Sequence, residues 1–200
     1  GDPNLPSSSS VIPWEIDKNC KVLKNDSTAN QQPCSYPSSG KGSILLFGDS
    51  HAASYSETFR DIARRYDLDL YVSTYSDCPF LLSLDGYAEM GNVPYFSTSC
   101  LRHNQELLRF VENNQIQTAF YAQRARAEDA DSQIVDSISK LNGLKTKVVV
   151  LGMNPEYIPV STILGNIIDR RGSFNTKVKL VNDYWQKITS ENSLRYIDVY

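Results

Sequence analysis

Residues 44–52 read ILLFGDSHA, and this stretch decides which fold the chain can adopt. Its four leading apolar residues form an unbroken run that ends at Gly48, which is typical of a strand covered on both faces of a parallel sheet. From Ala52 to Tyr66, apolar side chains recur every three or four residues and predict an amphipathic helix. A buried strand that turns directly into a helix indicates an α/β domain.

The same alternation continues along the chain. Further strands are predicted at 70–74, 118–122, 147–152 and 194–199, and further helices at 101–114, 129–141 and 178–188. We therefore expect a three-layer α/β/α domain of the flavodoxin-like type, with a five-stranded parallel sheet in the order 2-1-3-4-5. The loops that follow the strands should meet at one edge of the sheet, where such folds place their sites. These loops are 48–51, 75–79, 123–127 and 153–157.

Composition limits the class of protein. The 200 residues are 40% hydrophobic, enough for one sizeable core, and the net charge of −3 gives no broad cationic surface for nucleic acid. No apolar run approaches the about 20 residues that a membrane-spanning helix needs. The Pro- and Ser-rich start without a Met suggests one domain of a longer protein. We expect residues 1–42 to be a loop-rich extension packed on a domain at 43–200.

The chain has four cysteines in two closely spaced pairs, Cys20 with Cys34 and Cys78 with Cys100. Three pairings are formally possible, and a bridge between the first two would hold down a polar segment. The alternative is four unrelated buried thiols. We expect no metal, because there is no CxxC pair and the two histidines lack ligand spacing. We expect no cofactor either, because the first loop lacks a phosphate cradle.

The tetrapeptide at 48–51 carries the candidate chemistry. Where a strand turns into a helix, Ser50 can present its hydroxyl at the sheet edge while its own N–H points toward a developing oxyanion. Gly48 permits the tight turn, and Asp49 can cap the helix or hold the loop through backbone N–H groups. The alternative is that Asp49 and Ser50 are simply residues that open a helix.

Residues 45–53 resemble the first conserved block of the SGNH (GDSL-like) hydrolases. They are more closely similar to the SGNH domain fused behind the membrane domain of family-three bacterial membrane O-acyltransferases. Residues 76–79 resemble the Cys-Pro segment of that subfamily, and similarity continues at 148–156 and 196–199. The resemblance implies an SGNH fold, Ser50 as nucleophile with Asp49 and Ser76 in support, and a disulfide between Cys78 and Cys100.

Two segments depart from the family pattern. The third block, Gly-x-Asn-Asp, is replaced after the third strand by residues 121–125, YAQRA. Either Gln123 or Arg124 could supply the second oxyanion donor, or could be a solvated loop residue; Arg124 fits the subfamily. The family's catalytic Asp and His come from an Asp-x-x-His that residues 1–200 do not contain, so we expect it beyond Tyr200. His51 or His103 could replace the missing catalytic base. The simpler expectation is that His51 packs near the start of the helix and that His103 faces solvent on a helix.

The resemblance implies a function: O-acyl transfer, most simply O-acetyl transfer, to an extracytoplasmic bacterial glycan such as a lipopolysaccharide through a serine acyl-enzyme. An N-terminally fused membrane acyltransferase domain would then deliver the acyl donor. One alternative is a secreted carbohydrate O-acetyl esterase. Another is a catalytically silent glycan-binding module with aromatic platforms drawn from Tyr71, Tyr75, Tyr87, Tyr95 and Tyr121.

Overall fold

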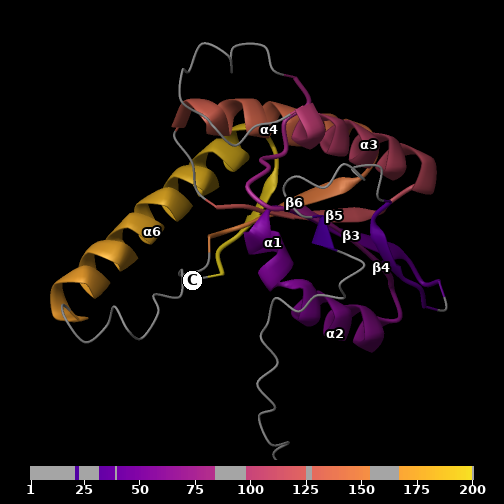
Figure 1. Ribbon diagram of the computed structural model, residues 1–200, viewed down its shortest axis with the longest axis horizontal. Helices are drawn as coiled ribbons and strands as arrows, with labels where there is room; N and C mark the ends of the chain where they lie inside the picture. Colours follow the sequence, from indigo (N-terminus) through magenta and orange to yellow (C-terminus); the bar gives the residue numbers. More distant parts are fainter. Residues whose placement is uncertain are drawn as a thin grey trace, which may run out of the picture.

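The computed structural model describes residues 21–22, 32–38, 40–83, 98–124, 128–153 and 167–199 (Figure 1). Its strands form one sheet in the order β1-β4-β3-β5-β6-β7, and β2 pairs antiparallel with β4. The strands are β1 (Lys21–Val22), β2 (Cys34–Tyr36), β3 (Ser43–Gly48), β4 (Asp69–Tyr75), β5 (Thr118–Ala122), β6 (Lys147–Leu151) and β7 (Arg195–Ile197).

The five predicted strands are β3 to β7, and their order and parallel direction confirm the predicted 2-1-3-4-5 sheet. The predicted count of five was wrong, because the segment expected to be loop-rich adds two strands. β2 pairs with Leu70–Val72 of β4, and β1 pairs with Thr74 and Tyr75 further along the same edge. Strands of two and three residues are too short to show a periodicity in the sequence.

The helices form the two outer layers of the domain. They are α1 (Ser50–Ser54), α2 (Ser56–Tyr66), α3 (Thr98–Asn114), α4 (Glu128–Gly143) and α6 (Ile167–Glu191). In Figure 1, α3 and α4 lie above the sheet and α1 and α2 lie below it. Trp185 of α6 belongs to the same core cluster as the buried residues of α3 and α4. The helix predicted at 52–66 is divided at Tyr55, and the one predicted at 178–188 begins earlier in the chain.

Alternate residues of each central strand face opposite layers. In β3, Leu45 and Phe47 pack into the cluster with α3, α4 and α6, whereas Ile44 and Leu46 pack against α1 and α2. All four side chains are buried, as the unbroken apolar run predicts for a strand covered on both faces. The sheet is therefore the middle layer of an α/β/α sandwich.

Parallel pairing brings the carboxyl ends of the strands to one edge. Gly48, the last residue of β3, lies opposite Thr74 of β4 on one side and Ala122 of β5 on the other. The segments that continue from these residues leave the sheet together and carry the candidate site. Among the described helices, none combines the length and the apolar composition needed to span a bilayer.

Candidate active site

The site begins at Gly48, where the end of β3 leaves no room for a side chain against β5. Gly48 has a φ of 137°, a conformation that residues with a side chain rarely adopt, and a Cβ built on it would lie 1.9 Å from the carbonyl oxygen of Ala122. Only a glycine fits here without displacing backbone. This close approach places the turn after β3 directly beside the segment that follows β5.

Asp49 joins these two segments through its carboxylate. Its side chain is 1% exposed; Oδ1 accepts the backbone N–H of His51 at 2.8 Å, and Oδ2 accepts the backbone N–H of Arg124 at 3.0 Å. The first bond caps α1, and the second ties that cap to the segment after β5. Asp49 thus fixes the backbone on either side of Ser50 and next to Gln123.

Ser50 is exposed as the first residue of α1, and no described residue hydrogen-bonds to its hydroxyl. Ser76 leaves the sheet at the same level, because each serine lies two residues beyond a paired position, Gly48 for Ser50 and Thr74 for Ser76. Ser76 is half-buried in a turn that the Cys78 N–H closes on the Tyr75 carbonyl at 3.2 Å. The two serines therefore lie on neighbouring strand ends.

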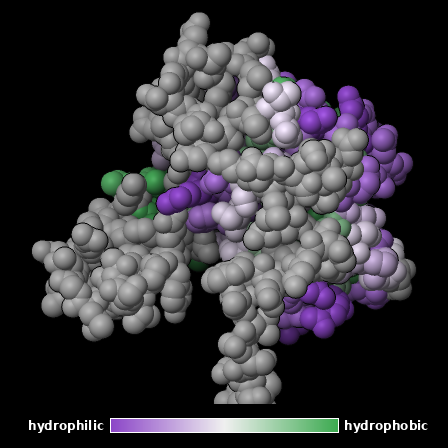
Figure 2. Space-filling view, in the orientation of Figure 1, coloured by the Kyte–Doolittle hydropathy of each residue, from purple (hydrophilic) through white to green (hydrophobic). Residues whose placement is uncertain are grey.

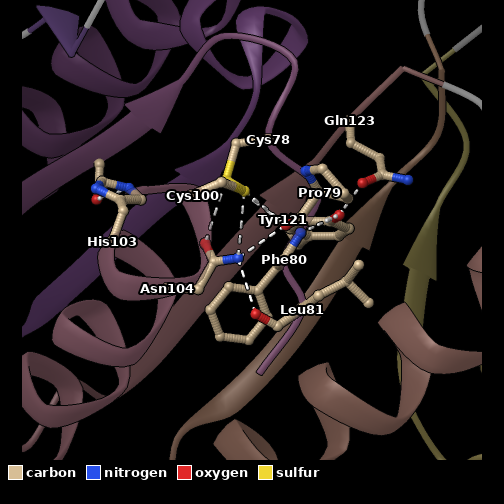
Figure 3. Close-up of a disulfide and its surroundings, with 10 residues drawn as sticks. Cys78, Pro79, Phe80, Leu81, Cys100, His103, Asn104, Tyr121 and Gln123 are labelled. Carbon is tan, nitrogen blue, oxygen red and sulfur yellow. Dashed lines mark hydrogen bonds between the residues drawn. A yellow bond between two sulfur atoms is a disulfide. The ribbon is translucent and has the colours of Figure 1, made fainter. Parts of the chain in front are cut away.

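Gln123 lies at the inner side of this edge with a side chain that is only 6% exposed. Its Oε1 accepts a hydrogen bond from the Tyr121 hydroxyl, while its Nε2 has no partner among the described residues (Figure 3). A buried amide that keeps an uncommitted donor is rare in folded proteins, because each such group costs the energy of its lost hydration. Gln123 is therefore a candidate to donate to a bound substrate.

Arg124 lies at the same edge in a different environment. Its side chain is exposed, whereas its backbone N–H is held by Asp49 at 3.0 Å. The structure thus separates the two candidates for the second oxyanion donor: a buried carboxamide at Gln123 and a solvent-facing guanidinium at Arg124.

A disulfide braces the segment after β4. Cys78 and Cys100 are bonded, as the resemblance implied, with their Cα atoms 5.6 Å apart. Asn104, one turn further along α3, donates from Nδ2 to the carbonyls of Pro79 at 2.8 Å and Leu81 at 3.0 Å (Figure 3). Cys34 on β2 is also disulfide-bonded, but Cys20, its expected partner, lies outside the described residues.

The two histidines occupy different places. His103 is 5% exposed, so the prediction of a solvent-facing residue was wrong; its Nε2 lies 3.2 Å from Ser73 Oγ, and its ring centroid lies 5.4 Å from that of Tyr75. Burial lowers the His103 pKa to about 4, which keeps the ring neutral at pH 7. The structure pairs His103 with Ser73 and not with Ser50. His51 is half-buried on α1.

A polar cluster that the sequence analysis missed joins α6 to the ends of β6 and β7. Asn182 is 3% exposed; its Oδ1 accepts the Met153 N–H at 2.8 Å, and its Nδ2 donates to the Met153 carbonyl at 3.3 Å and to Asp198 Oδ1 at 3.2 Å. Burial, followed by the charge of Asp198, raises the pKa of Tyr196. The sequence offered one signal for this cluster: Asn182 follows Val181, which lies on the predicted inward side of the helix, so a polar side chain was to be expected near the core.

A mostly parallel sheet in the order observed here, flanked by helices on both faces, is an α/β domain of the SGNH hydrolase-like fold. Residues 19–200 match the family described as the SGNH domain fused to AT3 domains, and the chain belongs to this family. No curated protein matches the chain in sequence.

Two solved structures share the fold. The periplasmic domain of a lipopolysaccharide acetyltransferase from Salmonella ser. Paratyphi A is 17% identical with a TM-score of 0.67, over 92% of this chain and 74% of that one. A putative acylhydrolase from Bacteroides fragilis NCTC 9343 is 11% identical with a TM-score of 0.51, over 94% of this chain and 77% of that one. Family membership supports acyl transfer or ester hydrolysis in general, and an AT3 domain as the fused partner.

Proposed function

We propose that this domain transfers an acyl group, most simply acetyl, to a hydroxyl of an extracytoplasmic bacterial glycan through a Ser50 acyl-enzyme. The observation that carries the proposal is the edge where β3 and β5 end: Ser50 presents an exposed hydroxyl after β3, and Gln123, after β5, has a buried Nε2 that is uncommitted among the described residues. A membrane AT3 domain of the same protein would supply the acyl donor. The glycan is proposed because the similar Salmonella domain belongs to a lipopolysaccharide acetyltransferase.

The proposed reaction has two steps. Ser50 Oγ attacks the acyl carbonyl carbon, its proton passes to a general base, and the carbonyl oxygen becomes an oxyanion. The Ser50 backbone N–H and Gln123 Nε2 would donate to that oxygen, and the donor's leaving group departs with a proton. A sugar hydroxyl then attacks the acyl-serine carbonyl carbon and gives its proton to the same base; the bond to Ser50 Oγ breaks, and the base returns the proton to that oxygen. We propose that the base is the family's Asp-x-x-His, placed after β7.

Asp49, Ser76 and Arg124 have supporting roles in this proposal. Asp49 holds the Ser50 turn and the Gln123–Arg124 segment at fixed separation through its two backbone hydrogen bonds. Ser76 lies on the neighbouring strand end, and the exposed Arg124 guanidinium would meet the glycan at the mouth of the site.

The test compares Ser50→Ala with Ser54→Ala in the full-length protein. Ser54 is exposed on the same helix, one turn from Ser50, and its hydroxyl donates to the His51 carbonyl at 2.7 Å. We expect Ser50→Ala to lower p-nitrophenyl acetate turnover at least about 1,000-fold and to abolish labelling by a fluorophosphonate. Ser54→Ala should leave both unchanged.

The acceptor decides between the proposed activities. Acetyl transfer to a glycan in preference to water would support the transferase, whereas hydrolysis alone would support a carbohydrate esterase. Glycan binding that survives Ser50→Ala, without labelling or turnover in the wild type, would contradict both and favour the silent binding module.

A further inference from the structure

A chain of buried hydrogen bonds connects the segment after β4 to Gln123 (Figure 3). The backbone N–H of Phe80 donates to the Tyr121 hydroxyl oxygen at 3.3 Å, and the Tyr121 hydroxyl donates in turn to Gln123 Oε1. Tyr121 is fully buried. The chain therefore runs from the disulfide-braced segment to the candidate oxyanion donor without passing through solvent.

The direction of these bonds determines which end of the Gln123 amide is uncommitted. Because the Tyr121 oxygen accepts from Phe80, its own proton is left to donate, and the atom that receives it must be Oε1. Nε2 is then turned away from Tyr121. The terminal torsion of a glutamine is broad and roughly two-fold, so without this contact the amide would have little intrinsic preference between its two orientations.

The Tyr121 ring cannot swing to follow Gln123, because aromatic neighbours hold it. Its centroid lies 5.0 Å from that of Phe47, 6.5 Å from that of Phe80 and 6.4 Å from that of Trp185. Phe80 is held in turn, because Asn104 binds the carbonyls on both sides of it and the Cys78–Cys100 disulfide ends two residues earlier. The Tyr121 hydroxyl is therefore held in one position relative to the sheet and to Phe80.

We propose that Tyr121 is a positioning residue that holds the Gln123 amide with its N–H bonds directed at the oxyanion formed on the Ser50 adduct. This inference rests on the proposed function. Tyr121 itself touches neither substrate nor the reacting atoms, and it acts only through Gln123.

A double-mutant cycle on kcat tests this role in the full-length protein with p-nitrophenyl acetate. Gln123→Ala should lower kcat about 100-fold, because one oxyanion donor is lost. Tyr121→Phe should lower kcat about 10- to 100-fold with little change in KM, because the donor remains but is misaligned. In the Gln123→Ala background, Tyr121→Phe should have no further effect, because its only route to the reaction is gone.

Tyr71→Phe is the matched control. Tyr71 is half-buried on β4, and its ring packs against Phe110 at 5.1 Å in the same core cluster, away from the carboxyl edge. It should leave kcat unchanged. A second measurement does not depend on turnover: the Gln123 side-chain N–H signals, assigned by their loss in Gln123→Ala, should shift in Tyr121→Phe and stay in place in Tyr71→Phe.

The outcomes separate this inference from the proposed function. Retained turnover in Ser50→Ala would overturn both. If Ser50→Ala is inactive, an unchanged kcat in Tyr121→Phe overturns the positioning role alone. The positioning role is also overturned if Tyr121→Phe lowers kcat equally in the wild-type and Gln123→Ala backgrounds. It is overturned as well if the Gln123 side-chain amide signals do not shift in Tyr121→Phe.

Discussion

At the turn after β3, two adjacent residues do different physical work. Gly48 lets two backbones approach more closely than any side chain permits, and Asp49 binds the backbones together once they are there. The position of Ser50 depends on both. A change at either residue should therefore affect stability and activity together.

Gly48→Ala should lower the free energy of unfolding by more than about 2 kcal/mol, because the new methyl group would lie against the Ala122 carbonyl and the φ of 137° would be strained. Gly143→Ala is the control: it ends α4 with nothing within 4 Å of the added Cβ, so it should be neutral or stabilise by up to about 1 kcal/mol. Urea unfolding of both variants measures the difference. Equal effects would contradict the close-approach argument.

Single residues differ in how far sequence could predict them. Ser50 and Asp49 stand in a local motif, so the predicted strand, turn and helix were enough to single them out as candidates. The orientation of the Gln123 amide depends on Phe80, more than forty positions earlier in the chain, and no local pattern contains that contact. His103 was misjudged because the inward side of α3 mixes polar and apolar residues, which periodicity treats as a surface.

Among the elements, the described residues after β4, 76–83, form no helix or strand and are held by contacts with their neighbours. The attachments of this segment to α3 are the disulfide and the two bonds from Asn104. Because the segment also donates to Tyr121 through Phe80, any loosening of these attachments should reach the site.

Removing the disulfide by the double change Cys78→Ala and Cys100→Ala should cost about 3 kcal/mol of unfolding free energy, the chain-entropy value for cysteines 22 positions apart. Turnover at a temperature where the variant stays folded should also fall. Urea unfolding and p-nitrophenyl acetate kinetics measure the two effects. Wild-type activity in a double variant of reduced stability would show that the remaining hydrogen bonds of the segment, those from Asn104 included, fix it without the disulfide.

The elements themselves were largely predictable, since strands β3 to β6 are apolar runs bounded by turn residues. The boundaries and the short elements were not. β1 and β2 form by hydrogen-bonding to the backbone groups of β4 that β3 does not pair. The residues of β1 and β2 carry no local pattern that predicts this pairing. Tertiary pairing, not local propensity, makes them strands.

For the molecule as a whole, His103 couples stability to pH. Burial lowers its pKa to about 4 from an ordinary value of 6.5, so between these values the unfolded chain binds a proton that the folded chain does not. The stability that comes from keeping His103 neutral in the folded chain is fully present above pH 6.5 and is lost as the pH falls toward 4. The free energy of unfolding should decrease by roughly 1.4 kcal/mol per pH unit in this window.

Denaturant unfolding at several pH values, for the wild type and His103→Gln, measures this contribution. The variant lacks the titrating ring, so the difference between the two curves isolates it from the carboxylates. Parallel curves between pH 4 and 6.5 would contradict the assignment.

The pairing of β1 and β2 with β4 also bears on where the folding unit begins. Composition changes at Ser43, yet a chain cut there would leave β4, which supplies Leu70 and Val72 to one core, as the bare margin of the sheet. The shift in composition at Ser43 therefore does not coincide with the start of the sheet, because β1 and β2 lie before it in the chain. We expect that a graft of this domain onto another protein would have to carry the upstream strands to keep β4 paired on both sides.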